Sequence, residues 1–186
     1  MSVQFARHYF TVAEYERMGK TGVFALDDRV ELIEGEIIEM SPVGSRHAAC
    51  VDVVANILHE QLRGKAIVRV QSPIVLDDFS EPQPDVSLLK FREDFYRDAH
   101  PRPEDVLLVI EVADTTVEYD RHVKIPMYAR AGIPEALVFN LPDDQLECYA
   151  QPEAGHYKIA RILKRGDHFE SSNVSGLVLD VATILG

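Results

Sequence analysis

Tryptophan is absent from this sequence of 186 residues, and cysteine occurs only twice. Cys50 and Cys148 lie far apart and show no CxxC spacing, which indicates reduced thiols in a cytoplasmic protein rather than a disulfide framework. No stretch approaches the roughly 20 consecutive apolar residues that a membrane span requires. Residues 1–10 lack a basic start followed by an apolar run, so no secretory signal is expected.

Positive charge is also scarce. The chain has 19 Lys and Arg residues against 31 Asp and Glu residues, which gives a formal net charge of −12. This balance argues against an extended basic surface of the kind that binds nucleic acid tightly. Hydrophobic residues make up 46% of the chain, enough for a buried core. The length suits one domain, and residues 1–186 are interpreted as such.

Hydrophobic periodicity predicts helices and strands in mixed order. Helices are expected over 11–18, 45–63 and 120–130, and strands over 29–40 (a hairpin around Gly35), 66–76, 84–89, 106–112, 136–140, 146–150 and 157–163. Thr11, followed by Glu14, is expected to cap the first helix, and Ser45 the second. Pro126 predicts a kink or a late start of the third helix. Residues 177–185 fit either a strand or a helix.

The third helix lies between two apolar runs. The order of strand 106–112, helix 120–130 and strand 136–140 predicts a parallel crossover, because parallel neighbours need a long connection. The run 106–112 is apolar enough for a central strand that is covered on both faces. The sequence therefore predicts an α/β fold.

Two carboxylates accompany these predicted strands. Glu111 follows an apolar run, where a charge is costly unless it is paired or binds a metal; alternatively, it lies at the open end of the strand and meets solvent or a nearby arginine. Asp85 follows Pro84 at the start of another strand, although a Pro-Asp pair is also ordinary in turns. Carboxylates on neighbouring strands are able to share one Mg²⁺ ion with waters and phosphate oxygens.

Lys124 lies four residues after Asp120, on one face of the predicted helix. Its ammonium group is able to point back over the strand ends and to assist an attacking water or stabilise charge on a phosphoryl group. The spacing by itself favours a surface ion pair between these two residues, which contributes little to stability.

Two further residues are candidates for binding substrate. Gln83 lies two residues before Asp85 and is expected on the same face of the strand, where it would contact a water or a phosphate; capping of a turn explains it equally well. His47 lies at the start of the second helix, where a phosphate is favoured. An ordinary surface histidine is the alternative.

Several segments resemble the Uma2 family (DUF820), which belongs to the PD-(D/E)xK superfamily of restriction-endonuclease-like folds. They are Pro84-Asp85, Glu111-Val112-Ala113, the stretch 120–135 and the upstream stretch 31–47. The likeness runs from about residue 10 to about residue 185. It implies a restriction-endonuclease-like core in which helices flank a mixed central β-sheet, with an N-terminal helix and hairpin.

The resemblance also implies a site. Asp85 and Glu111 match the motif carboxylates that bind Mg²⁺ or Mn²⁺. The usual motif lysine would fall at Ala113, and Lys124 occupies the place to which that lysine has moved in Uma2-like sequences. Glu34 is expected to match an acidic residue that an early element adds to the pocket. Glu31 and Glu36 are the alternatives for that place.

The function implied is a metal-dependent endonuclease that hydrolyses phosphodiester bonds of DNA. A homodimer is expected, since two active sites are needed to cut both strands. The net charge of −12 and the alanine at position 113 favour the alternative, a catalytically inactive relative that acts as a metal-binding or protein-binding module.

Overall fold

A six-stranded sheet forms the centre of the structure, a computed structural model that describes residues 6–25 and 27–186. Residues 1–5 of the stretch considered for a secretory signal lie outside the described part. The strand order is β3 (Ala66–Val70), β4 (Val86–Lys90), β5 (Val106–Ala113), β6 (Glu135–Asn140), β7 (Gln145–Glu153) and β8 (His156–Lys164). Only β5 and β6 pair in parallel, so the sheet is mixed, as expected.

A helical segment connects β5 with β6 and confirms the predicted crossover. It consists of a short helix α3 (Val117–Tyr119), a π-helical turn (Asp120–Lys124) and helix α4 (Ile125–Arg130). Pro126 is the second residue of α4 and lies two residues after the end of the π-helical turn. Because proline has no N–H to donate to the preceding turn, a change of hydrogen-bonding register at this point is well tolerated.

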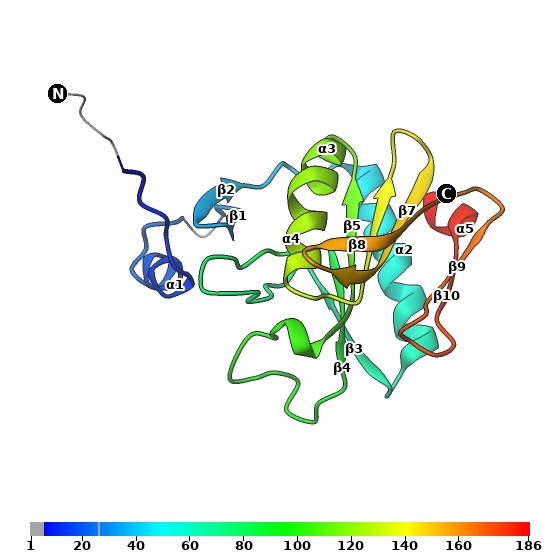
Figure 1. Ribbon diagram of the computed structural model, residues 1–186, viewed down its shortest axis with the longest axis horizontal. Coiled ribbons are helices and arrows are strands. Elements are labelled where there is room, and N and C mark those ends of the chain that lie inside the picture. Colours follow the sequence, from blue (N-terminus) through cyan, green and yellow to red (C-terminus); the bar gives the residue numbers. More distant parts are fainter. Residues whose placement is uncertain (1–5, 26) are drawn as a thin grey trace.

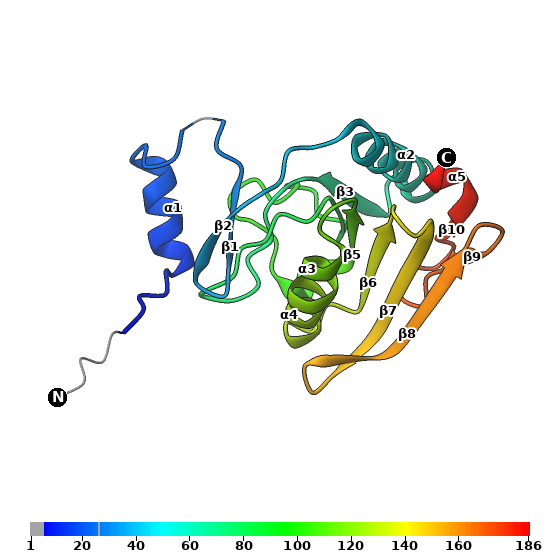
Figure 2. The same cartoon turned by 90° about the horizontal axis from the view of Figure 1, so that it is seen from above.

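Helices cover both faces of the sheet (Figures 1 and 2). Helix α2 (Ser45–Leu62) and the C-terminal helix α5 (Val181–Leu185) pack on one face, where α2 buries Val54 and Leu58 against Leu108 and Ile110. Helix α4 packs on the other face, in a cluster that includes Met127, Tyr128, Val109 and Val138. Side chains alternate along β5, and Glu111 therefore projects toward the crossover segment.

The N-terminal helix and hairpin lie together at one end of the molecule (Figure 1). Thr11 and Glu14 form the expected capping box at the start of helix α1 (Val12–Lys20). The hairpin pairs β1 (Val30–Ile33) with β2 (Glu36–Glu39). Its turn residues Glu34 and Gly35 both have positive φ, 50° and 82°, as a two-residue type I′ turn requires.

Three local predictions need correction or completion. Gly44, not Ser45, is the N-cap of α2, and no side chain caps that helix end. The strand expected over 66–76 ends at Val70, because Gln71 turns the chain with a positive φ of 44°. The tail that fitted either a strand or a helix contains both, β10 (Val178–Asp180) and then α5. Strand β10 pairs with β9 (His168–Glu170), which was not predicted.

Cys50 and Cys148 are both free and buried. Across the described residues, no helix combines the length and the apolar character needed to cross a lipid bilayer.

Candidate functional site

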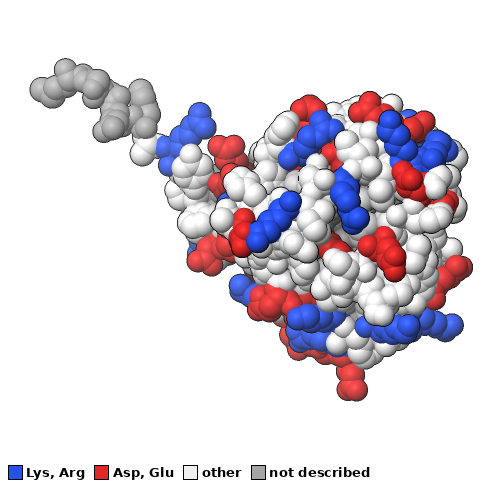
Figure 3. All heavy atoms as spheres, turned by 45° about the vertical axis from the view of Figure 1, so that its right-hand side comes forward, with Lys and Arg blue, Asp and Glu red and all other residues white. Residues whose placement is uncertain are grey.

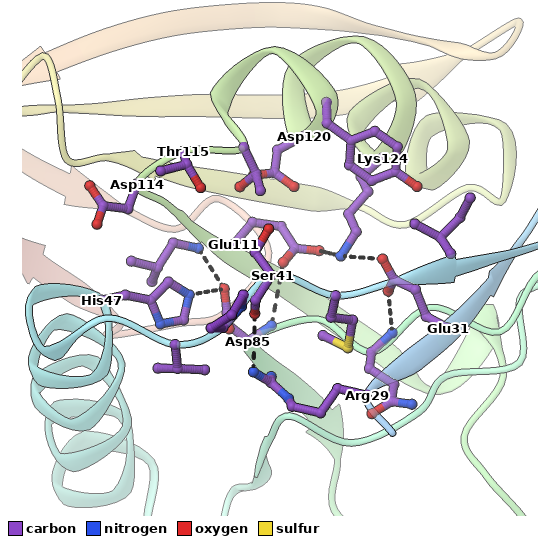
Figure 4. A pocket seen from close by; sticks show the side chains of 18 of the residues that line it. Arg29, Glu31, Ser41, His47, Asp85, Glu111, Asp114, Thr115, Asp120 and Lys124 are labelled. Carbon is purple, nitrogen blue, oxygen red and sulfur yellow. Dashed lines mark hydrogen bonds and ion pairs between the residues drawn. The ribbon is translucent and has the colours of Figure 1, made fainter. Parts of the chain in front are cut away.

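A cavity of about 350 Å³ lies between the hairpin β1–β2, the start of α2 and the crossover segment. Six acidic and two basic side chains line it: Glu31, Glu39, Asp85, Glu111, Asp114 and Asp120, with Arg29 and Lys124. Figure 4 shows most of these side chains turned toward one another. The cavity therefore carries a surplus of negative charge, which favours a bound cation.

Asp85 immediately precedes β4, and the pairing of Val86 with Ile110 places it beside Glu111. One carboxylate oxygen accepts hydrogen bonds from the backbone N–H of Val112 at 2.9 Å and from His47 Nε2 at 3.1 Å. Burial opposes ionisation of this carboxyl group. The hydrogen bonds from His47 and Val112 outweigh burial and lower the pKa of Asp85. The group is thus held as a carboxylate.

Glu111 is almost completely enclosed, with 3% of the residue exposed. Its Oε1 accepts a hydrogen bond from the hydroxyl of Tyr128 at 2.6 Å and lies 3.3 Å from Lys124 Nζ. Its Oε2 lies 3.4 Å from the backbone N of Asp85. Burial raises the pKa of Glu111 to about 8, and the ammonium of Lys124 only partly opposes this rise.

Lys124 lies inside the cavity, not on the surface. Its Nζ is 3.2 Å from Glu31 and 3.3 Å from Glu111, and only 5% of the residue is exposed. The interpretation as a surface ion pair is therefore wrong. Burial opposes the charged form, but the carboxylates of Glu111 and Glu31 outweigh it and raise the pKa of Lys124. This lysine stays protonated at physiological pH.

Asp120 shares the π-helical turn with Lys124 and is also buried. Thr116 Oγ1 donates to its carboxylate at 2.6 Å. Burial raises the pKa of Asp120 to about 6, against the opposing effect of Lys124. The sequence offered only the spacing between Asp120 and Lys124 as a signal, and that spacing is equally typical of solvated helix faces.

The expectation for Glu34 is wrong in its placement. Glu34 lies in the exposed turn of the hairpin, outside the cavity, and pairs with Arg130. Glu36 is also exposed. Glu31, which was considered as an alternative, is the residue of this segment that reaches the pocket, because the side chains of β1 alternate between its two faces and that of Glu31 points inward to Lys124.

The two candidate substrate-binding residues both line the cavity. His47 Nε2 contacts Asp85, while His47 Nδ1 is buried and has no hydrogen-bond partner in the described part of the chain. The side-chain amide of Gln83 donates to the backbone carbonyl of Val30 at 3.0 Å, and its backbone N–H donates to Glu31. Gln83 thus ties the hairpin to the strand that carries Asp85.

The oxygen donors of this cavity fit a hard divalent cation. Asp85 and Glu111 supply carboxylates from adjacent strands, and Mg²⁺ is often held by one or two carboxylates together with waters and substrate oxygens. Nowhere in residues 6–25 and 27–186 do three or more His, Cys, Asp or Glu side chains form a ready-made metal site. Two carboxylates would leave the other coordination positions of such an ion to waters and substrate oxygens.

Residues 12–182 match the sequence model of Uma2, described as "Putative restriction endonuclease". The chain belongs to the Uma2 family. A solved structure from Anabaena variabilis, described as a putative nuclease belonging to DUF820, is similar to this Uma2 chain in fold. The TM-score is 0.72 with 13% sequence identity, over 95% of this chain and 97% of the other. No protein with a curated description matches the chain.

Proposed function

We propose that this Uma2 protein is an Mg²⁺- or Mn²⁺-dependent endonuclease that hydrolyses phosphodiester bonds of DNA. The observation that carries the proposal is the convergence of Asp85, Glu111 and Lys124 around one acidic cavity, with Lys124 Nζ 3.3 Å from Glu111. These are the groups that metal-assisted hydrolysis requires: hard oxygen ligands and a fixed positive charge.

The divalent cation would be held by Asp85 and Glu111, and it would lower the pKa of a water and offset charge on the phosphoryl group. Lys124 keeps its proton, so its role is to donate a hydrogen bond and to stabilise negative charge that develops in the transition state. The hydroxyl of Tyr128 donates a hydrogen bond to Glu111 and so fixes the orientation of that side chain. Glu31 holds the ammonium of Lys124 on its other side.

The acidity of the cavity explains how an acidic protein would act on a polyanion. Acidic side chains outnumber the two cationic ones, so phosphate is repelled until a divalent cation offsets part of the negative charge. Binding of substrate at the cavity is therefore expected to depend on the metal.

Cleavage of supercoiled plasmid DNA in Mg²⁺ or Mn²⁺ tests the proposal. We expect nicked or linear product from the wild-type protein and none from Asp85→Asn or Lys124→Met, because these variants remove a metal ligand and the fixed charge. Asp52→Asn, at an exposed position of α2, is the matched control and should cleave normally. Cleavage that persists in both site variants would contradict the assignment of this cavity.

Metal binding is measured separately by calorimetric titration of Mn²⁺ into the metal-free protein. The wild type and Asp52→Asn should bind, and Asp85→Asn should bind at least tenfold more weakly. Equal affinity in all three proteins would exclude Asp85 as a ligand, whatever the result with plasmid.

One observation favours a second candidate, a member that binds a partner without catalysis. Both oxygens of Asp85 already accept hydrogen bonds, one from Gln71 at 3.2 Å and the other from His47 and Val112. A carboxylate that is fully engaged within the protein is able to serve structure alone. Absence of both Mn²⁺ binding and cleavage in a folded protein would favour this candidate.

A further inference from the structure

We propose that a second groove, between α1 and the segment 95–102, binds a strand of nucleic acid, with phosphates on Arg69, Arg97 and Arg102 and an unpaired base stacked on Phe95. This inference rests on the proposed nuclease function and names the surface that would hold the substrate strand beside the acidic cavity. The groove has a volume of about 660 Å³.

The charge of the groove is opposite to that of the protein as a whole. Four cationic side chains line it, against two acidic ones: Lys20, Arg69, Arg97 and Arg102, with Glu16 and Asp98. Lys20 and Glu16 neutralise each other at 3.2 Å. The three arginines form no ion pair with any residue that the structure describes. Their charge is therefore available to a polyanion.

Three arginines without an ion pair among the described residues line this one groove. Figure 3 shows a face on which basic and acidic side chains are interspersed without an extended region of one sign. The net charge of −12 also excludes general attraction of phosphate. His100 lines the same groove; burial lowers its pKa, the charge of Arg69 adds to this effect, and Glu16 opposes it.

Two exposed aromatic side chains lie near Arg69, outside the lining of the groove itself. Phe91 and Phe95 are 46% and 59% exposed, and their rings meet edge-on with centroids 6.0 Å apart. The backbone carbonyl of Phe95 accepts a hydrogen bond from Arg69 at 3.0 Å, which joins this aromatic pair to the groove. Stacking of unpaired bases on aromatic side chains, beside a basic track for the phosphates, is how proteins bind single strands.

The backbone at this place is held in an unusual conformation. Phe95 and Tyr96 have φ angles of 51° and 55°, a region that large side chains seldom adopt. The conformation buries Tyr96, with Arg92 and Arg69 over its ring at 4.4 and 5.6 Å, while it presents Phe95 to solvent. Strain of this kind persists where the surrounding structure enforces it, and it is frequent at ligand-binding sites.

Strand β3 connects the groove with the acidic cavity. Arg69 lies two residues before Gln71, and the side-chain amide of Gln71 donates a hydrogen bond to Asp85. Gln71 follows the last residue of β3 and turns the chain with a positive φ of 44°. Arg69 is thus two residues along the chain from a side chain that contacts Asp85.

The test is fluorescence anisotropy with a labelled 20-nucleotide single strand, without metal and at low salt, so that no cleavage occurs. We expect the double variant Arg97→Glu/Arg102→Glu to bind at least tenfold more weakly than the wild type. The slope of the logarithm of its binding constant against the logarithm of the salt concentration should become shallower by about 1.4. Each lost phosphate contact on a single strand accounts for about 0.7 of this slope. Phe95→Ala should weaken binding about tenfold, as loss of one stacked base predicts.

The matched control is Arg161→Glu/Lys164→Glu, which makes the same change of charge on β8, at the opposite edge of the sheet from β3. It should bind as the wild type does. If both double variants weakened DNA binding equally, the proposal that this groove is the binding site would be overturned, because the effect would then follow from the net charge of the protein alone. Tighter binding of the duplex of the same sequence, or unchanged binding by Phe95→Ala, would overturn base stacking.

This experiment separates the groove from the nuclease proposal. Groove-dependent binding by a protein that never cleaves DNA would retain the groove and reject the proposed catalysis. Cleavage by a protein whose groove variants bind and cleave normally would retain the catalysis and reject the groove.

Discussion

The ammonium group of Lys124 lies 3.2 Å from the carboxylate of Glu31, and both side chains are almost completely buried. This pair joins the crossover segment to the first strand of the hairpin. It makes Glu31, and not the nearby Glu34, the residue of that hairpin on which the position of the lysine depends.

Replacement of Glu31 by glutamine should therefore lower the free energy of unfolding by about 1–3 kcal/mol, because a buried ammonium loses one of its two carboxylate partners. The rate of DNA cleavage by this variant should fall as well. Glu34→Gln breaks an exposed pair with Arg130 and should cost at most about 1 kcal/mol. Urea denaturation of both variants is the measurement, and a larger loss in Glu34→Gln would contradict the assignment.

Tyr128→Phe removes the hydroxyl that donates to Glu111 at 2.6 Å. We expect a loss of about 1–3 kcal/mol in stability, since a buried acceptor loses a hydrogen-bond partner, and at least a tenfold fall in cleavage rate. Tyr157→Phe is the control: its hydroxyl donates to the backbone carbonyl of Ile133 at 2.9 Å, away from the cavity. That variant should lose stability but retain its activity.

Ala113, where the resemblance noted from the sequence would place the motif lysine, is completely buried. Lysine at this position would have to fit its long side chain and charge into the packed face of β5, so Ala113→Lys should destabilise the protein by more than about 2 kcal/mol. It should not rescue Lys124→Met. Ala160→Lys, at an exposed position of β8, should leave the melting temperature nearly unchanged. Cleavage by the double variant Ala113→Lys/Lys124→Met would show that either position can carry the lysine.

Glu147 gives a pH dependence that is separate from the cavity. Burial opposes its ionisation, but hydrogen bonds from Arg121, Tyr149 and Asn140 outweigh burial and lower its pKa from 4.5 to about 2. Its folded pKa is below the unfolded one, so its contribution is complete above pH 4.5 and is lost as the pH falls toward 2. The contribution is about 3 kcal/mol.

Urea denaturation of Glu147→Gln and wild type should therefore differ by about 3 kcal/mol at pH 7 and by much less near pH 2. Asp144→Asn, which alters a half-exposed carboxylate beside Arg46, is the control and should show a small difference at both values. If the difference in free energy of unfolding between wild type and Glu147→Gln did not change with pH, it would contradict the lowered pKa.

The sequence predicted the strands of the central sheet and the closeness of Asp85 to Glu111. A carboxylate inside an apolar run is costly, and that cost points to a partner or a ligand whatever the details of packing. The parallel crossover between β5 and β6 followed from the order of the elements. Local pattern was sufficient in these cases, because strand neighbours along the chain are also neighbours in the sheet.

The parts that the sequence did not predict depend on register and on distant segments. Glu31 and Glu34 differ by three positions, and only the placement of the turn at Glu34 and Gly35 decides which one faces inward. Asp120 and Lys124 have a spacing that surface residues share. The groove between α1 and the segment 95–102 brings Arg69 of β3 next to a loop almost thirty positions later, and no local sequence pattern predicts that proximity.

The π-helical turn between α3 and α4 has a consequence for how this site tolerates change in length. A π-helical turn is closed by i→i+5 hydrogen bonds and holds one residue more than an α-helical turn. Deletion of one residue between Asp120 and Lys124 should therefore convert it into an α-helical turn and leave Lys124 and Tyr128 facing Glu111. In α4 each residue turns the chain by about 100°, so a one-residue deletion between Ile125 and Tyr128 should instead rotate Tyr128 away from Glu111 while Lys124 stays in place.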